Sequence, residues 1–153
     1  MSDGELASLL VYAGLAILAA ASDLRSRTIP NYLNAVIAFA GLASVFAVGG
    51  ASDALSALAH LAVALAVGLG VYALGMWGGG DAKFYAATSA WFKLQYLPSL
   101  VIGISLAGLL LLIVWFVGGR LGGKTTQRSK AELPYGIAIA VGGIVSMGAV
   151  VVR

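Results

Sequence analysis

Cysteine is absent from the 153-residue chain, and histidine occurs once, as His60. Disulfides and thiolate metal sites are therefore excluded within this sequence, and one imidazole is too few for a histidine-based metal centre. We accordingly expect no metal and no cofactor. Charged residues are also scarce, at 10% of the chain, where a soluble domain carries about 25%. Any chemistry must therefore come from a few carboxylates, amines, amides and hydroxyls.

Apolar residues are abundant instead. They make up 61% of the chain, and the mean hydropathy is +1.00. A water-soluble core of this size could not hide so much apolar surface, so we expect an all-α, polytopic integral membrane protein. A membrane-spanning helix takes about 20 residues, which predicts about six spans in a single membrane-embedded domain over residues 1–153.

Six apolar runs support this count. They cover residues 6–22, 33–50, 54–77, 84–100, 101–118 and 134–152. The fourth is the weakest because it contains Lys93 and Gln95, and it is expected to be short or tilted. The first run is preceded by two acids and no Lys or Arg, whereas a cleaved signal peptide opens with positive charge. We therefore expect an uncleaved first helix.

The basic residues predict an orientation. With six spans, one side holds Arg25, Arg27, Lys83, Arg120, Lys124, Arg128 and Lys130, and the other holds only Lys93 and Arg153. Lys and Arg are enriched in cytoplasmic loops, so the first side is expected in the cytoplasm and both termini outside. If the fourth run failed to cross, the basic loop after residue 118 would lie outside, against this rule.

Small residues recur every four positions in two runs. One set is Ala62, Ala66 and Gly70, and the other is Ala138, Gly142 and Ser146. Such spacing allows close approach of helices in lipid, so both sets are expected at helix contacts.

Two aspartates stand out from the other acids. Asp23 follows the first run directly and Asp81 follows the third, and the topology places both at the cytoplasmic membrane face. Each by itself has a structural interpretation, since Asp23 can end a helix and Asp81 can cap one. Acids bordering a membrane are, however, rare and usually functional. Together, Asp23 and Asp81 indicate a paired-carboxylate site.

Such a pair has a defined chemistry. Two carboxylates within hydrogen-bond reach do not both ionise easily, so they share a proton and titrate together. One then acts as a base that activates water, and the other as an acid that protonates a carbonyl oxygen or a leaving amine.

Three glycines, Gly78, Gly79 and Gly80, precede Asp81. Glycine permits unusual backbone angles and the close approach of another chain, which would let an extended peptide lie against the two acids. The alternative is a flexible turn that ends a helix. A phosphate-binding loop is not indicated, because "GGGDAK" lacks the G-x-x-x-x-G-K-[ST] pattern.

These residues carry a resemblance. "GGGDAK" resembles the G-x-G-D motif of the type IV prepilin peptidases, which are intramembrane aspartic proteases. "DLRSRTIPN", from Asp23, is similar to the segment with that family's first catalytic aspartate. "LPYGIAIAVGG", from Leu133, is similar to the opening of its last helix. The three matches fall in order along most of the chain.

The resemblance implies that Asp23 and Asp81 form a catalytic dyad. It also implies that leader peptides of prepilins or pilin-like proteins are cleaved at the cytoplasmic face of the bacterial inner membrane, with the pilus assembly machinery as a further partner. The short first loop and the lack of cysteine resemble the small tight-adherence (Flp pilus) type, without a methyltransferase domain. Archaeal preflagellin peptidases share the dyad. Presenilin-like proteases pair G-x-G-D with a Tyr-Asp motif, where this chain has Ser22 before Asp23.

Further residues are expected near the site. Lys83 resembles a basic position of the motif and either supports the dyad or anchors the chain in the cytoplasm. Pro30 and Asn31 are expected to shape the start of the second helix, and Arg25 and Arg27 to set topology. The residues Pro134, Tyr135 and Gly136 either border the substrate path or begin the last helix.

Two other functions fit the same composition. A proton- or cation-coupled transporter would use the aspartates as ion sites near the bilayer midplane. A non-catalytic subunit of a pilus or secretion assembly would keep the fold without cleaving anything. No feature indicates nucleic-acid binding.

Overall fold

The computed structural model describes residues 2–121 and 135–152, and its regular structure there is entirely helical. The elements are α1 (Asp3–Ser26), α2 (Asn31–Ala73), α3 (Gly79–Ser89), the 3-10 helix η1 (Leu94–Tyr96), α4 (Leu97–Leu121) and α5 (Tyr135–Val151). The all-α class predicted from composition is confirmed.

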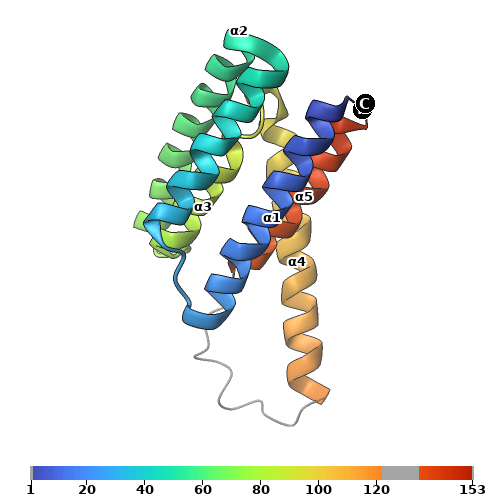
Figure 1. Ribbon diagram of the computed structural model, residues 1–153. Helices are drawn as coiled ribbons and strands as arrows, with labels where there is room; N and C mark the ends of the chain where they lie inside the picture. The colour runs from blue at the N-terminus through green and yellow to red at the C-terminus, as the bar shows by residue number, and fades with distance from the viewer. Residues whose placement is uncertain (1, 122–134, 153) are drawn as a thin grey trace.

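Helix α2 is a hairpin of two helical arms. A straight helix of its 43 residues would be roughly 65 Å long, about twice the hydrocarbon thickness of a bilayer. Gly50 breaks it with φ 76° and ψ −169°, a backbone conformation that essentially only glycine adopts. Figure 1 shows the two arms running side by side from this turn. The second and third apolar runs are therefore separate arms, as predicted.

Three helices in the described part of the chain are long and apolar enough to cross a membrane. They are α1, α2 and α4, and α5 is a shorter apolar helix. The chain is thus an all-helical membrane protein by length and composition. Figure 1 places the N- and C-terminal ends of the chain at the same end of the molecule, close to each other.

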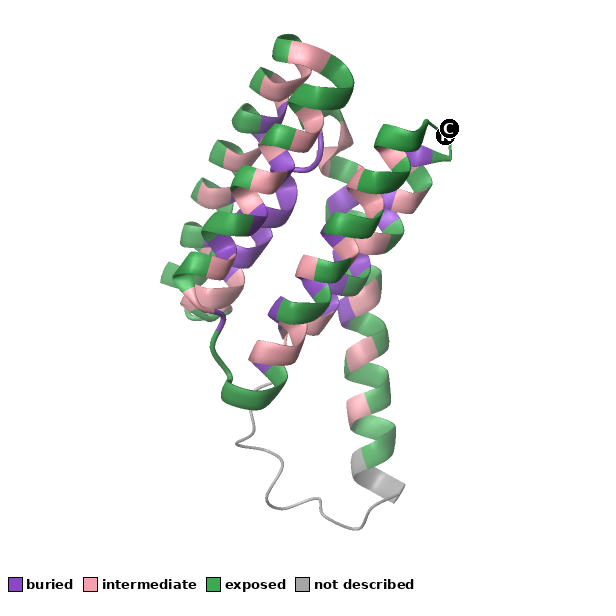
Figure 2. Ribbon diagram, in the orientation of Figure 1, coloured by how far each residue is buried: buried purple, intermediate pink, exposed green. Residues whose placement is uncertain are grey.

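The predicted fourth span, residues 84–100, is wrong in its bounds. Helix α3 has only 11 residues and ends at Ser89, and α4 begins at Leu97. At 1.5 Å per residue α3 is about 16 Å long, half of a bilayer core. Nearly all of its residues from Ala82 onward are buried inside the protein (Figure 2). The run is apolar because other helices surround it, which hydropathy does not distinguish from contact with lipid.

The helices form two groups. The arms of α2 pack against α3, and α5 packs against both α1 and α4. The groups meet where α1 contacts α2 and where α3 contacts α5. Figure 1 shows α1 and α5 lying side by side along most of their length. The chain between α3 and η1 joins the groups: Trp91 Nε1 donates to the carbonyl of Ile37 at 2.9 Å, and its ring lies 5.3 Å from that of Tyr12. His60 Nδ1 lies 3.1 Å from the carbonyl oxygen of Phe92, so this histidine makes a polar contact between α2 and the segment after α3.

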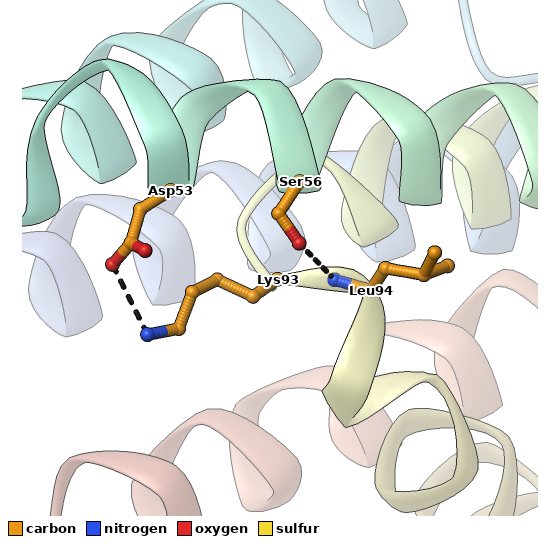
Figure 3. A network of polar contacts seen from close by, with 4 residues as sticks. All are labelled: Asp53, Ser56, Lys93 and Leu94. Carbon is orange, nitrogen blue, oxygen red and sulfur yellow. Dashed lines mark hydrogen bonds and ion pairs between the residues drawn. The ribbon is translucent and has the colours of Figure 1, made fainter.

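A polar network fixes the segment between α3 and α4 to the second arm of α2 (Figure 3). The Lys93 ammonium lies 3.1 Å from Asp53 Oδ2, and the Leu94 N–H donates to Ser56 Oγ at 3.0 Å. Lys93 is on the side predicted to lie outside the cell, and Asp53 is its partner there. Their mutual neutralisation lowers the cost of placing charge beside an apolar bundle.

One predicted small-residue contact is confirmed and the other is wrong. Ala138, Gly142 and Ser146 are all buried, and a Cβ at Gly142 would lie 2.5 Å from the backbone of Ile104 in α4. Ala62, Ala66 and Gly70 are exposed. The second arm of α2 instead buries Ala57, His60, Ala64 and Gly68, which share another face of the same helix.

Gly142→Ala should therefore destabilise the protein. The added methyl would meet the backbone of Ile104 at 2.5 Å, and backbone cannot rotate away as a side chain can, so we expect a loss of about 1–3 kcal/mol, typical of overpacking. The measurement is the melting temperature in detergent. Gly148→Ala in the same helix is the control, because nothing lies within 4 Å of its Cβ position. Equal melting temperatures for the two variants would contradict the α4–α5 packing described.

Candidate active site

Asp23 lies near the end of α1, with its side chain only 6% exposed. Its Oδ2 accepts a hydrogen bond from the Gly136 N–H at 3.0 Å, across 113 residues of sequence. Gly136 is in the first turn of α5, where N–H groups have no partner within the helix and the helix dipole is positive. The start of α5 thus provides a donor for a carboxylate that would otherwise be costly to bury.

The fit between α5 and Asp23 depends on glycine. A Cβ at Gly136 would lie 2.8 Å from Asp23 Oδ2 and 3.1 Å from its Cβ. Any side chain there would displace the carboxyl group. Position 136 therefore requires glycine, because α5 approaches Asp23 closely there. Helix α1 itself ends at Arg27, whose backbone is in the left-handed region at φ 55°.

Asp81 occupies the first turn of α3. Its Oδ2 accepts a hydrogen bond from the Gly78 N–H at 3.3 Å, the interaction of an acid at the third helical position with the N-cap backbone. The side chain is half-buried. Helix α3 is held against α2 at Gly68, where a Cβ would lie 3.1 Å from the Ala82 carbonyl oxygen. Both aspartates therefore accept bonds from N–H groups at helix N-termini.

The two aspartates line one cavity of about 760 Å³. Its other lining residues are Arg27, Thr28, Ile29, Asn31, Gly75, Met76, Trp77, Gly78, Gly79, Gly80, Lys83 and Tyr135. They come from the end of α1, the link to α2, the link between α2 and α3, and the start of α5. The cavity thus receives residues from both helix groups, with Asp23 in one group and Asp81 in the other.

Most residues predicted to support the site lie here. Lys83 Nζ donates to Asn31 Oδ1 at 2.9 Å, which joins the start of α2 to α3 beside Asp81. Tyr135 lines the cavity, and Gly136 contacts Asp23 as described. Pro30 is the N-cap of α2, with φ −59°, as expected of a residue that shapes the start of that helix. Pro134 lies outside the described residues.

The unusual backbone angles predicted for the glycine triplet are wrong. Gly78 has φ −73°, and none of Gly78, Gly79 and Gly80 has a positive φ. The left-handed residue in this link is Gly75, with φ 72°, which reverses the chain after α2. A Cβ at Gly80 would lie 3.6 Å from the backbone nitrogen of Ile29, an ordinary contact distance. The close approach of a substrate chain to the triplet stays a prediction. The unusual backbone angles predicted at the triplet thus occur three residues earlier.

Sequence reasoning missed the aromatic wall of the cavity. The ring of Trp77 lies 5.5 Å from that of Tyr135 and 5.6 Å from that of Tyr85. Nothing in the sequence around Trp77 indicated that its ring would line a cavity. Arg27, which was expected to set topology, also lines the cavity. The sequence did offer one indication of this role, because Arg27 lies one helical turn after Asp23.

Within the described part of the chain, no group of three or more His, Cys, Asp or Glu side chains could hold a metal ion. The two carboxyl groups that line the cavity, those of Asp23 and Asp81, lie in different surroundings. Asp23 is buried against the Gly136 N–H, and Asp81 is half-buried in the first turn of α3. Unequal surroundings are what allow one acid of a pair to hold a proton while the other accepts one.

The apolar helical fold and the cavity lined by two aspartates define a class of protein, the membrane-embedded proteins with a candidate carboxylate site. Comparison with protein families narrows this class. The model of the type IV leader peptidase family matches residues 10–113, which is more than half of the chain and includes both aspartates. The chain belongs to the type IV leader peptidase family. Searches of curated proteins and of solved structures found no match.

The match also bears on the resemblance drawn from sequence. The family assignment is confirmed, and two of the three resembling segments, around Asp23 and Asp81, lie within residues 10–113. The third, from Leu133, lies beyond the matched region. Its link to the site comes from the structure, through the hydrogen bond from the Gly136 N–H to Asp23.

Proposed function

We propose that this protein is an intramembrane aspartic endopeptidase that removes the leader peptide of prepilins or pilin-like proteins. The observation that carries the proposal is the single cavity lined by Asp23 and Asp81 in a member of the leader peptidase family. The short link between α1 and α2 and the absence of cysteine favour the small tight-adherence type. The pilus assembly machinery is a further proposed partner.

The reaction needs only the two carboxyl groups and water. One carboxylate takes a proton from water as the water oxygen bonds to the carbonyl carbon of the scissile peptide. The protonated partner gives its proton to the carbonyl oxygen. When the tetrahedral intermediate collapses, the C–N bond breaks and the amine nitrogen takes up a proton, which leaves a carboxyl group on the leader and an amine on the pilin.

The protein itself would supply positioning. The Gly136 and Gly78 N–H groups hold one oxygen of each aspartate, so the acids need not reorganise as charge moves between them. Trp77 and Tyr135 form an apolar wall against which the substrate chain can lie. Such a wall also limits the water around the reacting groups.

We further propose a six-span topology with the cavity facing the cytoplasm of a bacterial cell. The arms of α2 count as two spans, α3 with η1 forms a short fourth crossing, and α4 and α5 complete the set. An even number of crossings agrees with the two termini at one end of the molecule (Figure 1). The bias of seven basic residues against two supports the cytoplasmic side for the cavity.

Two other functions make different predictions. A cation-coupled transporter needs acids near the bilayer midplane, whereas Asp23 lies in the last turns of α1 and Asp81 in the first turn of α3. That placement favours the peptidase. A non-catalytic subunit with the same fold would leave prepilins uncut, so it is distinguished by direct assay.

The test is incubation of the purified protein, in lipid nanodiscs, with candidate prepilins. We expect loss of the leader and a new N-terminus at the boundary between the basic leader and the apolar helix, detected by intact mass. Protein carrying Asp81→Asn serves as the control for contaminating proteases. Intact prepilin after prolonged incubation with a panel of tight-adherence and type IV prepilins would overturn the proposal and favour a non-catalytic subunit.

A further inference from the structure

A second hollow lies beside the candidate active site. This lateral groove has a volume of about 290 Å³ and lies between the two arms of α2 and α3. Its lining is Asn34 and Ala38 from the first arm, Leu61 and Leu65 from the second, and Ala86 and Ala87 from α3, with Asn31 and Lys83 at one end. Asn31 and Lys83 also line the active-site cavity. The groove and the cavity therefore adjoin at these two residues.

Asn34 is the unusual residue of the lateral groove. Its side chain is 6% exposed, and neither Nδ2 nor Oδ1 has a hydrogen-bond partner among residues 2–121 and 135–152. A buried amide without partners costs stability, and leucine would avoid that cost at the same position. The Asn34 amide is therefore suited to form a hydrogen bond with a polar group of another molecule.

A prepilin substrate has unpaired backbone polar groups that would lie at the membrane depth of Asn34. A peptide bond must leave the helix to be cleaved, so the helix that follows the cleavage site begins with N–H groups that have no partner. In the membrane, unsatisfied backbone groups cost several kcal/mol. Asn34 lies three residues, about 4.5 Å, further along α2 than Asn31, which marks the junction with the active-site cavity.

We propose that the lateral groove binds the first turns of the apolar helix of a prepilin, with Asn34 bonded to an unpaired backbone group there. This inference rests on the proposed function and specifies the substrate-docking face. The small side chains of Ala38, Ala86 and Ala87 allow a second helix to approach closely, and Leu61 and Leu65 provide apolar contact. Asn34 is then a positioning residue for the substrate rather than a part of the α2 packing.

The first test uses two substrates. One is a full-length prepilin in nanodiscs, and the other is a soluble peptide that ends shortly after the cleavage site and lacks the apolar helix. We expect Asn34→Leu to lower kcat/KM for the full-length prepilin about tenfold while cleavage of the short peptide is unchanged. The melting temperature should be equal to or above that of the wild type. A lower melting temperature, or equal losses for both substrates, would overturn the role of Asn34.

The second test does not depend on cleavage. Because the chain has no cysteine, Leu65→Cys introduces a unique thiol in the groove, and Leu69→Cys places one outside it, at an exposed position on the same arm. With a prepilin that carries one cysteine early in its apolar helix, we expect oxidative cross-linking at least tenfold greater at position 65. Equal or reversed yields would overturn the docking face. If position 65 cross-links but the cysteine-free protein cleaves no prepilin, the docking groove is supported and the proposed peptidase function is refuted.

Discussion

Asp23→Asn and Asp81→Asn should each reduce prepilin processing by a factor of about 10²–10⁴, the range attributed to general acid–base catalysis. An amide cannot exchange a proton with water in the way a carboxyl group does. It can, however, still accept the hydrogen bond that Gly136 donates to position 23 or that Gly78 donates to position 81. The fold should therefore survive while the chemistry is lost. The measurement is the initial rate of leader release at saturating prepilin.

Asp53→Asn is the matched control. It removes an aspartate that pairs with Lys93 and does not line the active-site cavity. We expect its processing rate to stay within about twofold of the wild type. Either of the dyad variants cleaving at a rate comparable to Asp53→Asn would refute the assignment of Asp23 and Asp81 as the catalytic pair.

Gly136→Ala should reduce processing nearly as strongly, although it alters no ionisable group. The new methyl would lie 2.8 Å from Asp23 Oδ2, so either the carboxyl group or the start of α5 must move. Displacement of a reacting group by about 1 Å costs on the order of 10²-fold in rate. The measurement is kcat for a full-length prepilin together with the melting temperature.

Gly148→Ala is the control for Gly136→Ala, because it makes the same change in the same helix where nothing lies within 4 Å of the added Cβ. We expect its processing to match the wild type. If Gly136→Ala cleaves prepilin at the wild-type rate, then the contact between α5 and Asp23 does not position the reacting carboxyl group.

Several features could be predicted from the sequence because each depends on local composition. Apolar runs of sufficient length require helices in a membrane, since only helices satisfy their own backbone groups there. The break at Gly50 and the last helix from residue 135 follow from glycine and polar residues between such runs. The two aspartates were identifiable because acids at the borders of apolar helices are few in this chain.

Packing within the membrane was less predictable. Ala62, Ala66 and Gly70 are exposed whereas Ala57, Ala64 and Gly68 are buried, although both sets are small and share one helix. In a soluble protein, polarity separates the outer face from the inner one. Here both faces are apolar, so periodicity carries little information about which face contacts protein. The bounds predicted for the fourth span were wrong for the same reason.

The sequence by itself determined that this chain is helical and membrane-embedded, and it identified Asp23 and Asp81 as the candidate pair for acid–base chemistry. Only the tertiary structure decided what surrounds that pair: the Gly136 N–H that holds Asp23, the aromatic wall at Trp77, and the groove that contains Asn34. These contacts join segments distant in sequence. Their geometry depends on how closely helices approach one another, and that distance is set by side-chain volumes on both partners, which no single segment specifies.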